Sequence, residues 1–199
     1  ILTMNKEFRA CVAPHNDWFI ELDFNAAELR TLLALSGEPQ PPNDIHDWNV
    51  KNIFDGTLSR EEAKTKTFAW LYSRKENKDL ECLYNKNLVR NKYWDGFKIE
   101  TDYGRIIENV DEHHALNYIV QSTTIDMVHE QAYKVYELLK GRKSHISFLI
   151  HDAVYIDLAE EDRYEILNLL DTFKKTRYDM FKVNLSAGRN LGEMNALKL

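Results

Sequence analysis

Residues 18–36 read WFIELDFNAAELRTLLALS and contain the pattern that decides the fold. Apolar and polar residues alternate from Trp18 to Phe24, which predicts a strand that ends at Asp23. Asn25 then opens a helix with leucines on one face, and Gly37 ends it. An acidic residue is therefore predicted at the point where a strand gives way to a helix.

The rest of the chain mixes both periodicities. A helix capped by Asp44 is predicted at 44–54, and further helices at 57–72, 110–141 and 160–180. Residues 74–94 have weaker helical character, a hairpin is predicted at 97–108, and strands are predicted at 145–150, 153–158 and 181–185. The longer helix at 57–72 has a capping box, because Ser59 precedes Glu62 by three residues. These elements predict an α+β fold on a mostly antiparallel sheet. We expect residues 54–96 to project as a helical insertion from a main body of residues 1–53 and 97–199.

Composition excludes several classes of protein. The 199 residues are 44% apolar, enough for one domain or one and a half with a real core. No apolar run approaches the ~18 residues of a membrane span, and Ile1 to Arg9 show no signal-peptide pattern. The two cysteines, Cys11 and Cys82, exclude a disulfide scaffold and favour a reducing compartment.

The charge distribution is uneven although the net charge is only -6. Residues 63–98 hold nine Lys or Arg and four Asp or Glu, a surplus of +5, so the remainder carries -11. Such a basic segment between acidic ends suits a groove that holds a polyanion beside bound metal cations. A solvated helical surface would give the same charge pattern.

A row of four side chains marks the helix at 57–72. Arg60, Lys64, Phe68 and Tyr72 recur every fourth residue, so they form a stripe about 18 Å long. The cations lie near the helix N-terminus, where the helix dipole also favours anions, and the aromatic residues lie near the other end. A nucleoside triphosphate would match this stripe. An ordinary amphipathic helix with aromatic residues in the core is the alternative.

Two aspartates are candidates for metal binding. Asp23 ends a strand, and Asp152 is predicted in the tight turn between two strands, within LIHDAVYID. Carboxylates on adjacent strand ends can share two divalent cations ~3.5–4 Å apart and support in-line phosphoryl transfer. Magnesium suits such a site because it prefers oxygen ligands and retains water. Alternatively, Asp23 caps a helix and Asp152 is simply a turn residue.

Four motifs in this order resemble family A, the bacterial polymerase I-like DNA polymerases. LDFNAAELR with the downstream DIH is similar to motif A, and the spacing of Arg60, Lys64, Phe68 and Tyr72 is similar to motif B. IHDAV resembles motif C, and NYIVQSTTIDMV resembles the segment between motifs B and C. The resemblance runs from about Arg9 to the end and implies the palm and fingers of such an enzyme, with thumb and exonuclease domains absent from this chain.

The resemblance also implies roles for individual residues. Asp23 and Asp152 would be the catalytic metal ligands, with the backbone carbonyl of Phe24, for two Mg²⁺ ions that Mn²⁺ can replace. Six residues would contact the incoming nucleotide, with Glu28 as the steric gate against a ribose 2′-hydroxyl: Glu28, His46, Arg60, Lys64, Phe68 and Tyr72. Asn117, Gln121 and His151 would contact the primer–template.

The implied activity is template-directed transfer of deoxynucleotides to a primer 3′ end. The partners would be primer–template DNA, dNTPs and a segment or subunit that carries the thumb. A cytoplasmic location, in the host cell of a phage or mobile element, is expected. One departure stands out, because Ala153 occupies a position that is usually acidic in motif C. Two alternatives stay open: a non-catalytic polymerase-like DNA-binding or structural subunit, and a relative of single-subunit RNA polymerases.

Overall fold

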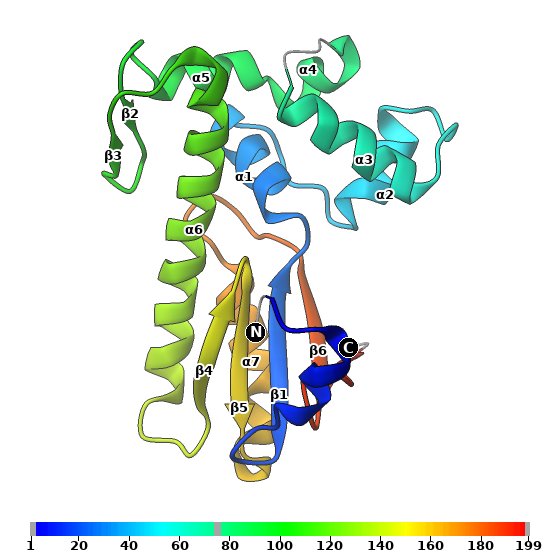
Figure 1. The fold of residues 1–199 in the computed structure, drawn as a ribbon, viewed down its shortest axis with the longest axis vertical. Coiled ribbons are helices and arrows are strands. Elements are labelled where there is room, and N and C mark those ends of the chain that lie inside the picture. Colours follow the sequence, from blue (N-terminus) through cyan, green and yellow to red (C-terminus); the bar gives the residue numbers. More distant parts are fainter. Residues whose placement is uncertain (1–2, 74–76, 198–199) are drawn as a thin grey trace. The chain divides into compact units, whose positions relative to one another are not determined.

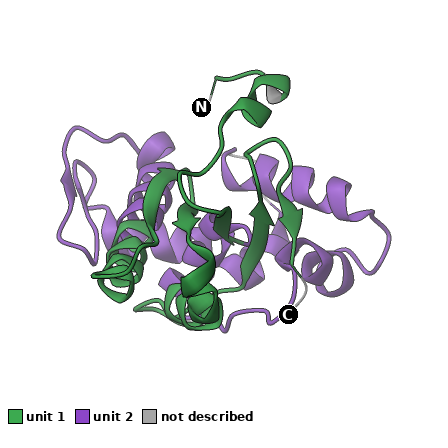
Figure 2. Cartoon of the chain, turned by 90° about the horizontal axis from the view of Figure 1, so that it is seen from below, with its two compact units in different colours: residues 1–24, 127–199 green, residues 25–126 purple. Residues whose placement is uncertain are grey.

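The structure, a computed structural model, describes residues 3–73 and 77–197. It contains two compact units, coloured separately in Figure 2. Residues 1–24 and 127–199 form the sheet unit, and residues 25–126 form the helical unit. The assignment of 1–53 and 97–199 to a palm and of 54–96 to a fingers insertion stays a prediction.

The sheet unit is built on five strands in the order β4-β5-β1-β6-β7 (Figure 1). The strands are β1 (Trp18–Phe24), β4 (His145–Ile150), β5 (Ala153–Leu158), β6 (Val183–Gly188) and β7 (Asn195–Ala196). Every neighbouring pair is antiparallel. The predicted α+β class with an antiparallel sheet is therefore confirmed.

Alternation along β1 separates a core face from a second face. Ile20, Leu22 and Phe24 are at most 2% exposed. Phe24 stacks on Phe173 of α7 (Ile166–Lys174), with ring centroids 4.4 Å apart, so α7 covers this face. Since side chains alternate along a strand, Asp23 points to the opposite face.

The end of α7 is fixed by a side chain from α6 (Glu112–Leu139). Gln131 is fully buried, and its amide nitrogen donates to three carbonyl oxygens at the C-terminal end of α7, at 2.8–3.0 Å. These carbonyls would otherwise lack partners at a helix end. The helix predicted over 160–180 is wrong in its extent, because a 3-10 helix covers Glu160–Glu165 and α7 stops at Lys174.

The described residues of the helical unit form five short helices, a small hairpin and the first half of α6. They are α1 (Ala27–Ser36), α2 (Ile45–Asn52), α3 (Arg60–Leu71), α4 (Lys78–Tyr84), α5 (Lys86–Tyr93), β2 (Ile99–Glu100) and β3 (Ile106–Ile107). The predicted capping box of α3 is present, with Ser59 and Glu62 bonded reciprocally. The described residues of both units include no helix with the length and apolar character that a bilayer span requires.

The start of α1 differs from the prediction that Asn25 opens the helix. The N-cap residue is Ala26, in the left-handed conformation with φ 53° and ψ 57°, and no side chain caps the helix. The buried side chain of Asn25 instead donates to Asp44 at 2.8 Å and accepts from the amide of Ile45 at 3.1 Å. Asn25 is therefore used to hold the loop before α2.

Ala26→Gly is expected to stabilise the protein. A left-handed alanine is strained by its Cβ, and relief of that strain outweighs the greater backbone freedom of glycine in the unfolded chain, for a net gain of about 0.5–1 kcal/mol. Equilibrium urea unfolding measures this change. Ala27→Gly, at the next and buried position in α1, is the control and should destabilise. A loss of stability in both variants would contradict the prediction.

Candidate functional site

The register of the sheet brings Asp23 and Asp152 to the same end of adjacent strands. Asp23 on β1 lies opposite Ala153 on β5 and opposite Asn184 on β6. The amide of Asn184 donates to the Asp23 carboxylate at 3.1 Å. The next amide along β1, that of Phe24, donates to the backbone carbonyl of Asp152 at 3.4 Å. The end of β1 is thus joined directly to the turn that carries the second aspartate.

That turn is a two-residue hairpin loop. Ile150 pairs with Ala153, so only His151 and Asp152 lie between β4 and β5. His151 has a left-handed φ of 52°, a conformation that histidine adopts more readily than most residues. Its side chain is exposed, whereas that of Asp152 is half-buried. The tight loop therefore fixes the backbone position from which the Asp152 side chain extends.

The electrostatics of Asp23 are those of a crowded acidic site. Burial raises its pKa to about 6, and the negative charges of Asp152 and Glu21 add to this effect, while the hydrogen bond from Asn184 opposes it. A divalent cation beside these carboxylates would offset both the burial and the repulsion. The donor set therefore fits Mg²⁺, which binds through one or two carboxylates and completes its shell with water and phosphate oxygens. The described residues contain no cluster of three or more His, Cys, Asp or Glu arranged to hold a metal ion.

Two further residues complete the Asp23 face of the sheet. Ala153 lies directly opposite Asp23, so its methyl group occupies the place where an acidic side chain would face that carboxylate. Glu21 lies two residues before Asp23 on the same strand and accepts a hydrogen bond from the hydroxyl of Tyr155. Sequence analysis missed Glu21, although the spacing of two along a predicted strand placed both acids on one face.

In the helical unit, the predicted row lies on the outer side of α3. The buried side of the helix consists of Ala63, Thr67, Trp70 and Leu71. Lys64 is exposed, Arg60 and Phe68 are half-buried, and Tyr72 is 38% exposed. The rings of Phe68 and Tyr72 lie roughly parallel with their centroids 6.3 Å apart. The two aromatic residues of the row are therefore not part of the core.

Tyr72, the residue that ends α3, is tied to two other predicted site residues. Its hydroxyl donates to the carboxylate of Glu28 on α1, and it is also hydrogen-bonded to Gln121 on α6. Burial and then the bond to Glu28 raise the pKa of the Tyr72 hydroxyl far above its usual range, so it stays protonated. Three of the predicted residues thus form one connected group.

His46, on α2, lies next to Phe68 of the α3 row. Its side chain is almost fully buried, and its ring centroid lies 5.9 Å from that of Phe68. Burial lowers its pKa; the negative charge of Asp44 opposes this effect, and the positive charges of Arg60 and Lys64 add to it. His46 is therefore neutral at physiological pH, and its buried Nδ1 atom has no hydrogen-bond partner among the described residues.

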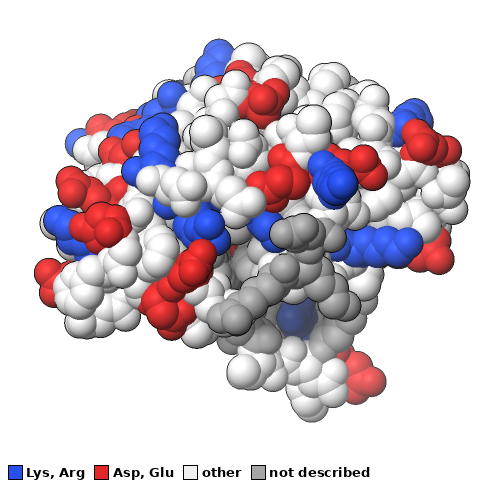
Figure 3. All heavy atoms as spheres, turned by 90° about the horizontal axis from the view of Figure 1, so that it is seen from above, with Lys and Arg blue, Asp and Glu red and all other residues white. Residues whose placement is uncertain are grey.

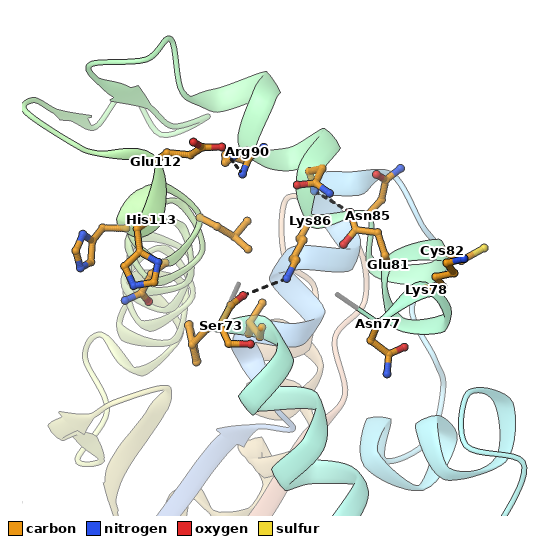
Figure 4. Close-up of a pocket in the computed structure, with 16 residues that line it drawn as sticks. Ser73, Asn77, Lys78, Glu81, Cys82, Asn85, Lys86, Arg90, Glu112 and His113 are labelled. Atoms are coloured by element: carbon orange, nitrogen blue, oxygen red, sulfur yellow. Dashed lines mark hydrogen bonds and ion pairs between the residues drawn. The ribbon is translucent and has the colours of Figure 1, made fainter. Parts of the chain in front are cut away.

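A cavity of about 980 Å³ opens beside the end of α3 (Figure 4). Its lining is about equally polar and apolar, and it includes Tyr72 and Asn117 together with the cations Lys78, Lys86 and Arg90. Lys86 extends toward the residues just after α3, where it donates to the carbonyl of Ser73 at 3.3 Å. Figure 3 shows cationic and anionic side chains interspersed over the described part of the face that it draws, so no uninterrupted basic patch is visible there.

Comparisons with known proteins identify the fold. A scan against protein families finds no match, and neither does a search of curated protein sequences. Among solved structures, the chain is similar to the POL domain of Pol1 from M. smegmatis, determined in complex with DNA primer-template and dNTP. The TM-score is 0.74 at 16% sequence identity, over 94% of this chain and 42% of that chain. The chain therefore has a fold like the palm and fingers of a DNA polymerase and spans less than half of that structure.

The carboxylate site should leave a signature in stability. The pKa of Asp23 is about 6 in the folded chain and 3.8 without the fold, so between these values the folded chain holds the proton more tightly. Its contribution to stability therefore falls as pH rises from about 4 to about 6 and stays low above that. Asp23→Asn removes this dependence. We expect the variant to be more stable than the wild type near pH 8 and equally stable near pH 4, measured by urea unfolding. A difference that does not vary with pH would contradict the prediction.

Proposed function

We propose that this chain is the catalytic palm and fingers part, or subunit, of a template-directed DNA polymerase of the family A type. It would add deoxynucleotides to a primer 3′ end by phosphoryl transfer with two divalent metal ions. The observation that carries the proposal is the position of Asp23 and Asp152 at the same end of adjacent strands, joined through the Phe24 amide. The polymerase-like fold supports it.

The catalytic metal ions would be bound at the end of β1 and the turn before β5. Asp23, Asp152 and the backbone carbonyl of Phe24 would hold two Mg²⁺ ions, or Mn²⁺ in their place. The ions, when bound, would supply the charge that activates the primer hydroxyl and stabilises the departing pyrophosphate. The single hydrogen bond from Asn184 leaves further lone pairs of the Asp23 carboxylate for metal coordination.

The outer side of α3 would bind the incoming nucleotide. Arg60 and Lys64 lie in the first turns of α3 and would hold the triphosphate, with neutral His46 as an uncharged hydrogen-bonding group. Phe68 would stack near the incoming base and sugar, and Tyr72 would lie at the nascent base pair. The primer–template would be contacted by Asn117, Gln121 and His151. The cavity beside Tyr72 and Asn117 is large enough for a nucleotide.

The bond between Tyr72 and Glu28 favours deoxynucleotides over ribonucleotides as substrates. Because the Tyr72 hydroxyl holds the Glu28 carboxylate, the side chain of Glu28 has a fixed position on the surface next to α3. A fixed side chain excludes a 2′-hydroxyl better than a mobile one. This observation favours a DNA polymerase over the alternative of an RNA polymerase relative.

Asp152→Asn is expected to lower primer extension with Mg²⁺ by about a thousandfold or more, since a neutral amide binds Mg²⁺ much more weakly than a carboxylate (about 4 kcal/mol of barrier). Steady-state incorporation of one nucleotide measures this. Asp171→Asn, an equal charge change at an exposed position of α7, is the control and should retain activity. Undiminished extension by Asp152→Asn would refute the polymerase proposal and leave the non-catalytic subunit as the interpretation.

Glu28→Ala is expected to admit ribonucleotides by removing the steric gate. The ratio of kcat/KM for a dNTP over the matching rNTP should fall by at least about tenfold. Tyr72→Phe keeps the ring and removes only the hydrogen bond that fixes Glu28, so its ratio should lie between wild type and Glu28→Ala. An unchanged ratio in Glu28→Ala would reject Glu28 as the gate.

A further inference from the structure

We propose that Asp44, the residue that caps α2, is a positioning residue that sets the orientation of the Arg60 guanidinium for the triphosphate. This inference rests on the nucleotide-binding role proposed for Arg60. Sequence analysis gave Asp44 only a capping role, because Asp44 and Arg60 are 16 positions apart and lie on different helices.

The two oxygens of the Asp44 carboxylate have separate tasks. Oδ1 accepts from the backbone amides of His46 at 2.9 Å and Asp47 at 3.1 Å, which caps α2. Oδ2 accepts from Nη2 of Arg60 at 2.8 Å and from Nδ2 of Asn25 at 2.8 Å. One side chain thus links the start of α2, which carries His46, to the first residue of α3.

A network of buried hydrogen bonds limits the movement of the Asp44 carboxylate. Asn25, which donates to this carboxylate, accepts two hydrogen bonds from Arg30. One reaches the backbone carbonyl of Asn25 at 2.8 Å and the other its side-chain oxygen at 3.2 Å. Arg30 is fully buried, and it also donates to the carbonyls of Pro41 at 2.8 Å and Asn43 at 2.7 Å. These bonds fix the loop that leads to Asp44, so the carboxylate has little freedom to follow Arg60.

Asp44 remains ionised throughout this arrangement. Burial acts to raise its pKa, but the hydrogen bonds from Arg60 and Asn25 outweigh it and hold the pKa of Asp44 well below its usual range. A charged carboxylate therefore faces Arg60 at every pH at which the protein is expected to work.

A second carboxylate also contacts Arg60, and it provides a comparison within the chain. Glu61 accepts from Nη1 of Arg60 at 2.6 Å. Its side chain is 74% exposed, against 20% for Asp44, so water screens this pair and lets Glu61 move. Arginine has five N–H donors, so donors remain for phosphate oxygens while Asp44 holds one edge of the group.

The test compares Asp44→Asn with Glu61→Gln in the whole chain, with primer–template, Mg²⁺ and a dNTP. Each variant removes one negative charge beside Arg60. Asparagine caps helices as well as aspartate, so Asp44→Asn keeps α2 while losing the ion pair. We expect Asp44→Asn to raise the KM for the dNTP about tenfold with little change in kcat. Glu61→Gln should leave KM within about twofold.

A second comparison separates positioning from overall electrostatics and from folding. Loss of negative charge alone would lower the KM in both variants, because the triphosphate is an anion. In an Arg60→Ala background, Asp44→Asn should have no further effect on KM. The equilibrium dissociation constant for the dNTP should rise with KM. Asp44→Asn also loses the bond from Asn25, so it should unfold at a lower midpoint than Glu61→Gln while remaining folded under the assay conditions.

Each outcome decides the inference. An unchanged or lowered KM in Asp44→Asn, equal shifts in both variants, or an effect that persists without Arg60 would overturn it while leaving the polymerase proposal intact. Wild-type protein that neither binds a dNTP nor extends a primer would instead overturn the proposed function, and this inference with it.

Discussion

The antiparallel pairing of β1 with β5 is the constraint on which the carboxylate site depends. It sets Asp23 opposite Ala153. The two-residue loop before Ala153 then fixes the position of the Asp152 backbone next to the end of β1. A register shift by one residue would turn Asp23 toward α7 and move Phe24 out of the core. The stacking of Phe24 on Phe173 therefore stabilises the same register that aligns the acids.

In the helical unit, charged groups are positioned by an ordered loop and not by a sheet. Residues 37–44 have no regular secondary structure, and the buried guanidinium of Arg30 holds them through their backbone carbonyls. A buried arginine is costly unless its donors are used, and here the hydrogen bonds to backbone oxygens offset that cost. The organised loop then presents a carboxylate to Arg60. In both units, buried contacts determine where half-buried charged groups lie.

The sequence predicted the elements that depend on local rules. Strand β1, the cap of α2 by Asp44 and the capping box of α3 follow from periodicity and side-chain chemistry within a few residues. Predictions failed where distant residues act. The helix over 160–180 stops at Lys174 because Gln131, from α6, takes up the carbonyls at its end. Asn25 does not cap α1 because Arg30 and Asp44 bind its side chain.

By itself, the sequence determined the fold class, the order of the motifs and the residue types available for chemistry, since these depend on composition and short-range spacing. The roles of Asp23, Asp152 and the α3 row stay predictions from those motifs. Only the tertiary structure decided that Tyr155 binds Glu21, that Tyr72 holds Glu28, and that Asp44 holds Arg60. The last two pairs join residues on different helices, and the Tyr155 contact of Glu21 crosses between strands. Such pairings depend on how elements pack, which no local pattern encodes.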